Sequence, residues 1–364
     1  SIVQGTEGTY SERESFTIET LPKLTNRGNK LCSLNATLLV VLRAYPDIIS
    51  MIERRRQQDM GETPFLDELA AVLSTKTQTN LLGLRRVLRG YYPLEPAYAV
   101  ECTVEGCGAE AMQRLVEVIQ RECGGDRRFC HIRRVTEDKG EPPLCPTCRR
   151  PLQEFSETQE RDVTCVGATY VVGAQQVDLQ QIMEATHVVG AQQVHLQQIM
   201  DDHEENERKE TAFTACLSCE QQHEVEGISE VIEAPENLFV EASGAIVELR
   251  GIGEDISWGG QSYEATGLVH HHQGHFYASI KGGQEWFMLE DYCDDEDLWK
   301  RKYFERGGRM ETVSDGTSST HCLHEKVLLV LLERKTEAEE EESEVCTVIS
   351  SSSCTMCLVP SEYT

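Results

Sequence analysis

The hydrophobic periodicity of the chain changes part-way along its length, and this change limits the folds open to it. Apolar side chains recur at helical spacing from Leu31 to Tyr45, where Pro46 stops the run. After Cys219 the pattern is of strand type and ends in the apolar run "EKVLLVLLER" (325–334), a candidate buried strand. Further helices are expected at about 64–74 and 80–89 and over 107–123. The sequence therefore predicts helices first and a sheet afterwards.

The composition argues against several classes of partner. The 364 residues carry a formal net charge of −28, whereas binding nucleic acid requires clustered Lys and Arg. The acidity either serves solubility or matches a basic partner. No apolar run is long enough for a membrane span, so no membrane partner is expected. Fifteen cysteines without a signal-peptide pattern indicate a reducing, intracellular location, in the cytoplasm or nucleus.

The two ends and the middle of the chain differ from the rest. Residues 1–20 are polar and expected to be flexible, and 336–364 form an acidic, Ser-rich tail expected to be disordered. Between 168 and 200 a segment is duplicated, "ATYVVGAQQVDLQQIM" being followed by "ATHVVGAQQVHLQQIM". Two copies are too few for a solenoid, so we expect one copy to form a strand and helix and the other an exposed insertion.

Two C-x-x-C pairs predict a structural zinc site. In a reducing compartment such pairs bind metal more readily than they form disulfides. Cys102 and Cys107 are competing ligands, and the pair "CTMC" in the tail is expected to be idle. The expected ligands are Cys145, Cys148, Cys216 and Cys219.

One cysteine and one histidine suggest nucleophilic catalysis. Cys32 begins the strongest early helix behind a Gly/Asn-rich turn, where backbone N–H groups and the helix dipole would favour a thiolate. A buried structural cysteine remains the alternative. His275 begins a predicted hairpin that turns at Gly282-Gly283 and ends on two acids, so it is a candidate base.

These stretches resemble the ubiquitin-specific protease family. "NKLCSLNATLLVVL" is similar to the family's Cys box, and "GHFYASIKGGQEWFMLED" to its His box. "GCGAEAMQRLVEVI" resembles the family's Gln-Gln-Asp-Ala helix, although its acid is displaced or replaced. "VDLQQIM", "CLSC", "IEAPENLFVEA" and "SYEATGLVHH" follow in the family's order, so the resemblance covers roughly residues 20–335.

The resemblance implies a fold and a reaction. The fold is α+β, a papain-like cysteine peptidase with a helical thumb, a β palm and zinc-tied fingers at about 140–225, within a catalytic domain at 21–335. The reaction is hydrolysis of the (iso)peptide bond after the C-terminal Gly of ubiquitin or a ubiquitin-like protein through a Cys32 thioester, with His275 as the base. No cofactor takes part in the chemistry.

The resemblance also implies roles for residues around this pair. Asn26 or Asn29 would hold the oxyanion, and Lys30-Leu31 make the Cys box one residue longer than usual. Glu290 shares a strand face with Trp286 and is the expected orienter of His275, whereas Asp291 points to the opposite face unless the strand ends there.

The remaining candidates concern substrate binding. The residues implied to line the channel for the ubiquitin tail are Tyr263, His272, Gly274 and Tyr277. For the run His270–His272 three interpretations stay open: a metal site, a lining of that channel, and polar residues at a strand end.

Two alternatives to a deubiquitinase follow from the same residues. The longer Cys box and the altered acids are compatible with a catalytically inactive ubiquitin-binding module of this fold. A zinc-dependent structural or interaction protein unrelated to peptidases is the second alternative.

Overall fold

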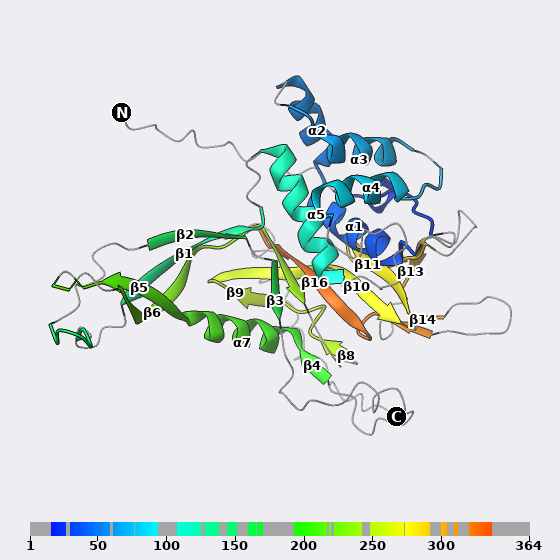
Figure 1. Ribbon diagram of the computed structural model, residues 1–364. Helices are drawn as coiled ribbons and strands as arrows, with labels where there is room; N and C mark the ends of the chain where they lie inside the picture. The colour runs from blue at the N-terminus through cyan, green and yellow to red at the C-terminus, as the bar shows by residue number, and fades with distance from the viewer. Residues whose placement is uncertain are drawn as a thin grey trace, which may run out of the picture.

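In the computed structural model, helices and sheets are combined in one chain, as the sequence predicts. The helices before residue 125 lie together on one side of the molecule, and a four-stranded sheet extends away from them on the other (Figure 1). The structure describes residues 16–26, 30–58, 61–75, 77–93, 108–124, 128–137, 144–150, 159–164, 166–169, 193–216, 218–219, 222–241, 248–272, 274–291, 300–303, 309–311 and 320–336.

The described residues contain the helices that the periodicity predicts, and also η1 and α2, which it does not predict. The described helices are η1 (Ile18–Thr20), α1 (Cys32–Ala44), α2 (Ile48–Gln57), α3 (Pro64–Ser74), α4 (Leu82–Tyr91), α5 (Gly108–Cys123) and α7 (Leu196–Arg208). Pro46 ends the apolar run of α1, as expected, but the chain resumes a helix two residues later at α2. The predictions for α1, α3, α4 and α5 are confirmed to within two residues.

The large sheet is eight-stranded, with the order β13-β12-β11-β10-β16-β7-β3 and with β9 paired to β10. Its strands are β3 (Val166–Thr169), β7 (Asn237–Glu241), β9 (Ile256–Trp258), β10 (Gln261–His272), β11 (His275–Gly282), β12 (Glu285–Leu289), β13 (Lys300–Lys302) and β16 (Val327–Arg334). The predicted C-terminal strand is confirmed as β16, which lies in the interior of the sheet.

Both faces of this sheet are buried, which explains the continuous apolar run of β16. Leu329 and Leu331 belong to a core cluster with the helices of the N-terminal part. Val330 and Leu332 belong to a second cluster, which includes Leu196 from α7. Successive side chains of a strand point to opposite faces, so β16 contributes to both cores.

Helix α1 packs against the face of the large sheet to which Leu329 and Leu331 contribute. It contacts β10, β11 and β16 (Figure 1). A Cβ on Gly267 of β10 would lie 2.9 Å from Cγ1 of Val40, so the absence of a side chain at Gly267 allows this close approach. This packing holds Cys32, the first residue of α1, close to β11, the strand that begins with His275.

The four-stranded sheet has the order β2-β1-β6-β5 and holds the segments with the paired cysteines at its end. Its strands are β1 (Cys130–Glu137), β2 (Gln159–Thr164), β5 (Lys209–Ala215) and β6 (Gln222–Glu233). Two smaller sheets pair β4 (Gln193–His195) with β8 (Glu248–Arg250) and β14 (Arg309–Glu311) with β15 (Thr320–Cys322).

The hairpin after His275 is confirmed, but its turn lies one residue later than expected. Gly282 still pairs with Glu285, so the two-residue loop is Gly283-Gln284 rather than Gly282-Gly283. Gly283 has φ +62°, a left-handed conformation that glycine adopts readily and that two-residue hairpin turns require.

The second copy of the duplication forms β4 and the start of α7, in keeping with the strand and helix expected of one copy. Most of the first copy and nearly all of the acidic tail lie outside the described residues, so the expectations for them are untested. Among the described helices, none is by itself long and apolar enough to cross a membrane, and α1 and α2 pass that test only together, bent by 80°.

Candidate active site

Cys32 is the first residue of α1 and is half-buried. Burial raises the pKa of the Cys32 thiol, the backbone N–H of Phe276 lowers it by hydrogen bonding, and the charge of Asp291 raises it. The pKa is raised on balance, so burial outweighs the thiolate stabilisation expected from the helix start. The contact with Phe276 places the sulfur beside the residue that follows His275.

His275 is the first residue of β11 and presents one ring nitrogen to two acids. Its Nε2 lies 3.7 Å from Oδ1 of Asp291 and 3.8 Å from Oε1 of Glu290. With Nε2 on the acid side, Nδ1 is the ring nitrogen that can exchange a proton with Cys32. The structure therefore brings His275 together with both acids that the sequence indicated.

Both acids reach the imidazole because β12 ends at Leu289, directly before Glu290. The alternation of strand side chains, which placed only Glu290 on the side of His275, no longer applies beyond that point. Burial raises the pKa of Glu290, and the charge of Arg301 opposes this shift. Glu290 therefore lies beside a cation as well as beside His275.

Asp291 is the more deeply buried of the two acids, with 6% of its surface exposed. Its Oδ2 accepts a hydrogen bond of 2.5 Å from Nδ2 of Asn35, whereas its Oδ1 makes no hydrogen bond within the described part of the chain. Burial raises the pKa of Asp291 to about 6, with the Asn35 hydrogen bond lowering it and Glu290 raising it. The oxygen without a hydrogen bond is the one that faces His275.

Asn26, one of the two residues expected to hold the oxyanion, is buried and lies six residues before the nucleophile. Its Oδ1 accepts the backbone N–H of Leu31 at 2.7 Å, which leaves its Nδ2 as a donor. Its own backbone N–H donates to the carbonyl of Asp291 at 3.1 Å. Lys30, in the longer Cys box, has φ 50°, and Asn29 lies outside the described residues.

The residues expected to bind substrate differ in their accessibility. Tyr263 is fully buried and its hydroxyl donates to the carbonyl of Pro235 at 2.8 Å, so its ring contributes to the core. Tyr277 is also buried. Gly274 is exposed between β10 and β11, and His272 pairs with His275 across that turn. Of these positions, Gly274 and the backbone of His272 lie beside the candidate base.

His270 is a buried core residue, which corrects two of the interpretations of the histidine run. It is fully buried, its Nδ1 lies 3.0 Å from the carbonyl of Glu325, and its Nε2 lies 2.8 Å from Oγ of Ser279. Its ring stacks on Tyr277 with centroids 4.6 Å apart. It is therefore neither a polar strand-end residue nor part of the metal-ligand group found among the described residues.

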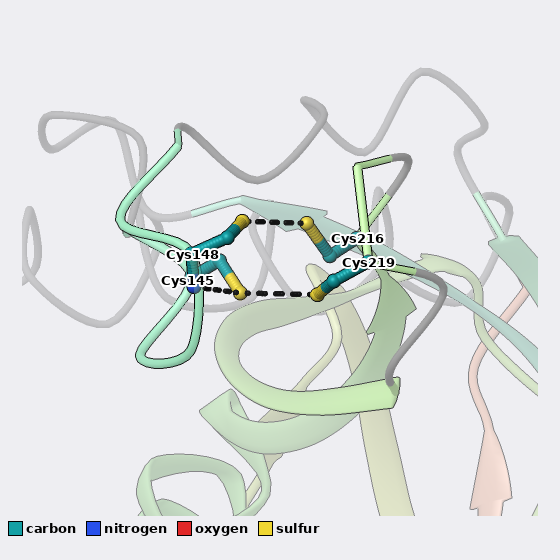
Figure 2. A group of neighbouring side chains, drawn as sticks. All are labelled: Cys145, Cys148, Cys216 and Cys219. Carbon is teal, nitrogen blue, oxygen red and sulfur yellow. Dashed lines mark hydrogen bonds between the residues drawn. The ribbon is translucent and has the colours of Figure 1, made fainter.

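The four cysteines of the two C-x-x-C pairs come together, as the sequence predicts (Figure 2). The sulfur atoms of Cys145 and Cys219 are 3.6 Å apart, and those of Cys148 and Cys216 are 3.5 Å apart. A disulfide has a bond of about 2.05 Å, so these are thiols. Tetrahedral zinc with Zn–S distances of about 2.3 Å separates its sulfurs by about 3.8 Å, close to the spacing observed.

The environment of the cluster lowers the pKa of two of its thiols, whereas burial and the neighbouring sulfurs of Cys216 and Cys145 raise the pKa of Cys148. The pKa of Cys145 is lowered to about 6, since backbone N–H groups of Cys148 and Thr147 outweigh the effect of burial. The pKa of Cys216 is lowered by the backbone N–H of Ser218. Deprotonated sulfur is the form that binds metal, so the cluster fits a structural zinc. The competing cysteines 102 and 107 lie outside the described residues.

Asn35 is the functional candidate that the sequence did not single out. It lies one helical turn after Cys32 on α1, is 1% exposed, and binds the carboxylate of Asp291. Its signal was present in "CSLN", where it occupies the Asn position of the family's Cys box. The contact itself joins residues 256 positions apart and could not be read from local spacing.

Comparison with known proteins finds similar solved structures but no matching sequence. No protein-family profile and no curated protein sequence matches the chain. Similar solved structures include the SAGA DUB module Ubp8/Sgf11/Sus1/Sgf73 bound to monoubiquitin, at 13% identity and TM-score 0.47 over 87% of this chain and 70% of that one.

The same module bound to ubiquitin aldehyde gives the same values. The yeast module with a mutant Sgf73 gives 12% identity and TM-score 0.46 over 87% of this chain and 69% of that one. Likenesses at these values carry no argument about function, which has to come from the residues of this chain.

Proposed function

We propose that the chain is a cysteine-type deubiquitinase in which Cys32 is the nucleophile and His275 the general base. The observation that carries the proposal is the convergence of three distant segments. Hydrogen bonding by the backbone N–H of Phe276, next to His275, acts on the Cys32 sulfur and lowers its pKa, and Nε2 of His275 faces the buried carboxylate of Asp291 and the half-buried carboxylate of Glu290. A nucleophile, a base and an orienting acid in this order are the components of acyl transfer.

The raised pKa of Cys32 makes the base necessary. Nδ1 of His275 accepts the thiol proton as the sulfur attacks the carbonyl carbon of the scissile bond. The oxyanion is held by the backbone N–H of Cys32 and by Nδ2 of Asn26, whose other end is fixed at Leu31. His275 then protonates the leaving amine as the carbon–nitrogen bond breaks, and a thioester remains on Cys32.

Water then hydrolyses the thioester, with His275 acting first as a base and then as an acid. His275 removes a proton from the water as its oxygen attacks the thioester carbonyl, and the carbon–sulfur bond breaks. The proton on His275 returns to the Cys32 sulfur, and the new carboxylate leaves. A carboxylate at Nε2 keeps the ring in its catalytic orientation and stabilises the imidazolium during both halves of the reaction.

The proposed substrate is ubiquitin, or a ubiquitin-like protein, joined to another protein. The resemblance of the Cys and His boxes to ubiquitin-specific proteases supports this choice. The formal net charge of −28 is also suited to an Arg-rich ubiquitin tail, since opposite charges speed encounter and can pair in the cleft. The linkage and the tagged protein are left open.

We further propose that the four-cysteine cluster holds a structural zinc ion. The ion would bind Cys145, Cys148, Cys216 and Cys219 and would join the segment between β1 and β2 to the segment between β5 and β6 (Figure 2). Zinc supplies folding energy at such a site and takes no part in the hydrolysis.

An inactive ubiquitin-binding module is the second candidate, and one observation favours it. Nε2 of His275 is 3.7 and 3.8 Å from its two acids, longer than a hydrogen bond, and the thiol is in its less reactive form. A module with this geometry could bind ubiquitin without cleaving it.

The test is hydrolysis of a ubiquitin-amide reporter by the wild-type chain and by Cys32→Ser. The hydroxyl of serine is far less ionised than a thiol, so we expect turnover to be lost and ubiquitin affinity to stay within a few-fold. Cys123→Ser, on the half-buried cysteine that ends α5, is the matched control and should keep full turnover. Turnover that survives in Cys32→Ser would refute the proposal.

A further inference from the structure

Two adjacent acids compete for the same nitrogen of His275. Nε2 lies 3.7 Å from a carboxylate oxygen of Asp291 and 3.8 Å from one of Glu290, so the two distances are nearly equal. An imidazole N–H points in one direction, so a single carboxylate can orient the ring at a time. Distance to His275 does not decide between the acids, and a third residue is needed to do so.

We propose that Asn35 is a positioning residue that selects Asp291, rather than Glu290, as the acid that orients His275. The proposal rests in part on the proposed function, because it concerns the same site. It differs from the expectation drawn from the sequence, in which Glu290 has this role.

The geometry of the Asp291 carboxylate carries the argument. Nδ2 of Asn35 holds Oδ2 at 2.5 Å, which stops rotation of the carboxylate and leaves Oδ1 facing His275. The backbone of the same residue is fixed as well, because its carbonyl accepts the N–H of Asn26. Both the side chain and the main chain of Asp291 are therefore held by the segments around the nucleophile.

Glu290 has a different environment. Its carboxylate interacts with the charge of Arg301 on β13, which stands at one end of the strand order of the large sheet, rather than with a donor from α1. Its longer side chain also has one more rotatable bond to fix, which costs conformational entropy. Within the described part of the chain, a side chain holds the carboxylate of Asp291 by a hydrogen bond but none holds that of Glu290, so Glu290 is the less preorganised of the two acids.

The position of Asn35 on α1 couples the acid to the nucleophile. Residues three apart lie on the same face of a helix, so α1 fixes the position of Asn35 relative to Cys32. The N–H of Asn35 donates to the carbonyl of Leu31 at 2.7 Å, which closes the first turn below the nucleophile. One helical turn thus sets the positions of both the sulfur and the orienting carboxylate.

The first experiment compares Asn35→Ala with a matched control, Thr37→Val. Thr37 is a buried residue of the same helix whose Oγ1 has no hydrogen bond in the described structure, so Thr37→Val changes packing little. We expect Asn35→Ala to lower kcat about 10- to 100-fold, as for loss of a charge-assisted hydrogen bond, with KM within a few-fold. A kcat equal to that of Thr37→Val would overturn the proposal.

A double-mutant cycle identifies the acid through which Asn35 acts. In the wild-type background Asp291→Ser should lower kcat more than Glu290→Gln. In the Asn35→Ala background the further loss from Asp291→Ser should be several-fold smaller, whereas the loss from Glu290→Gln should not shrink. Equal losses from Asp291→Ser in both backgrounds would show that Asn35 does not act through Asp291. If Asn35→Ala does not fold, Asn35→Leu, which is close to asparagine in size and has no hydrogen-bond donor, supplies the same test.

A chemical readout separates this proposal from the proposed function. Alkylation of Cys32 by iodoacetamide, followed by mass spectrometry of its peptide, requires a thiolate but no ubiquitin. Asn35→Ala should react several-fold more slowly than Thr37→Val at pH 7, and the difference should shrink as the pH is raised, because the thiol then ionises without His275. This result would support the role of Asn35 in positioning Asp291 even if no ubiquitin conjugate were cleaved. Identical pH profiles would contradict it.

Discussion

The buried charge of Asp291 is expected to lower the stability of the fold. Asp291→Asn should therefore raise the stability. The carboxylate is 6% exposed, and burial is the largest cause of its raised pKa. Asparagine removes the buried charge, keeps the shape and retains an oxygen that can accept the hydrogen bond from Asn35. The expected outcome is a more stable protein with lower turnover.

The magnitude follows from the pKa shift. A rise from 3.8 to about 6 is about two units, or about 3 kcal/mol at 1.36 kcal/mol per unit. Because the folded state binds the proton more tightly than the unfolded state, wild-type stability falls as pH rises from about 4 to about 6 and is constant above that. The advantage of Asp291→Asn should therefore be small at pH 4 and reach about 1–3 kcal/mol at pH 7.

The assay is thermal unfolding of the wild type and of Asp291→Asn between pH 4 and 8. At pH 7 the variant should unfold at a temperature higher by a few °C, since about 1 kcal/mol corresponds to about 2–4 °C in chains of 150–250 residues and to less in a longer chain. Asp201→Asn, on an exposed aspartate of α7, is the control and should show no such pH-dependent gain. A lower Tm for Asp291→Asn at pH 7, or a gain that does not vary with pH, would refute the reasoning.

Three further outcomes can be measured on the same protein. Metal analysis should find one zinc per chain, and Cys219→Ser should lose the zinc and lower Tm, whereas protein purified without chelators and free of zinc would contradict the site. Glu122→Gln should lower the free energy of unfolding in urea by about 2–3 kcal/mol. The buried carboxylate of Glu122 accepts hydrogen bonds from two backbone N–H groups at the start of α3 and from the hydroxyl of Tyr91. Glu53→Gln, on an exposed glutamate, is the control. Lys30→Gly should raise stability by about 1 kcal/mol by relieving a left-handed conformation, and a loss of stability would show that the Lys30 side chain contributes more.

Local patterns predicted the elements of this fold well where one interaction dominates. The apolar stripe of α1 and the continuous apolar run of β16 both follow from burial, on one face in the helix and on two in the strand. The apolar periodicity stops at Pro46 and does not predict α2, because a proline stops a helix only locally and the chain can resume a helix after it. The zinc-ligand set was predicted because C-x-x-C spacing is itself local.

The candidate site was only partly predictable, because its decisive contacts are tertiary. Cys32 and His275 stand in recognisable local motifs. The choice between Glu290 and Asp291 depends on where β12 ends and on Asn35, a residue 256 positions away from Asp291. The burial that raises the pKa of Cys32 likewise comes from the packing of α1 against β11, which helix-dipole reasoning on the sequence alone does not include.

The most direct test of the central claim is reaction with ubiquitin that carries an electrophile at its C-terminus. The account predicts a single covalent adduct, mapped by mass spectrometry to Cys32 and absent in Cys32→Ser. Because the electrophile must lie beside an activated thiolate, unmodified Cys123 in the same sample serves as the internal control. Binding of ubiquitin without an adduct, or an adduct on another cysteine, would contradict the assignment of Cys32 as the nucleophile of a deubiquitinase.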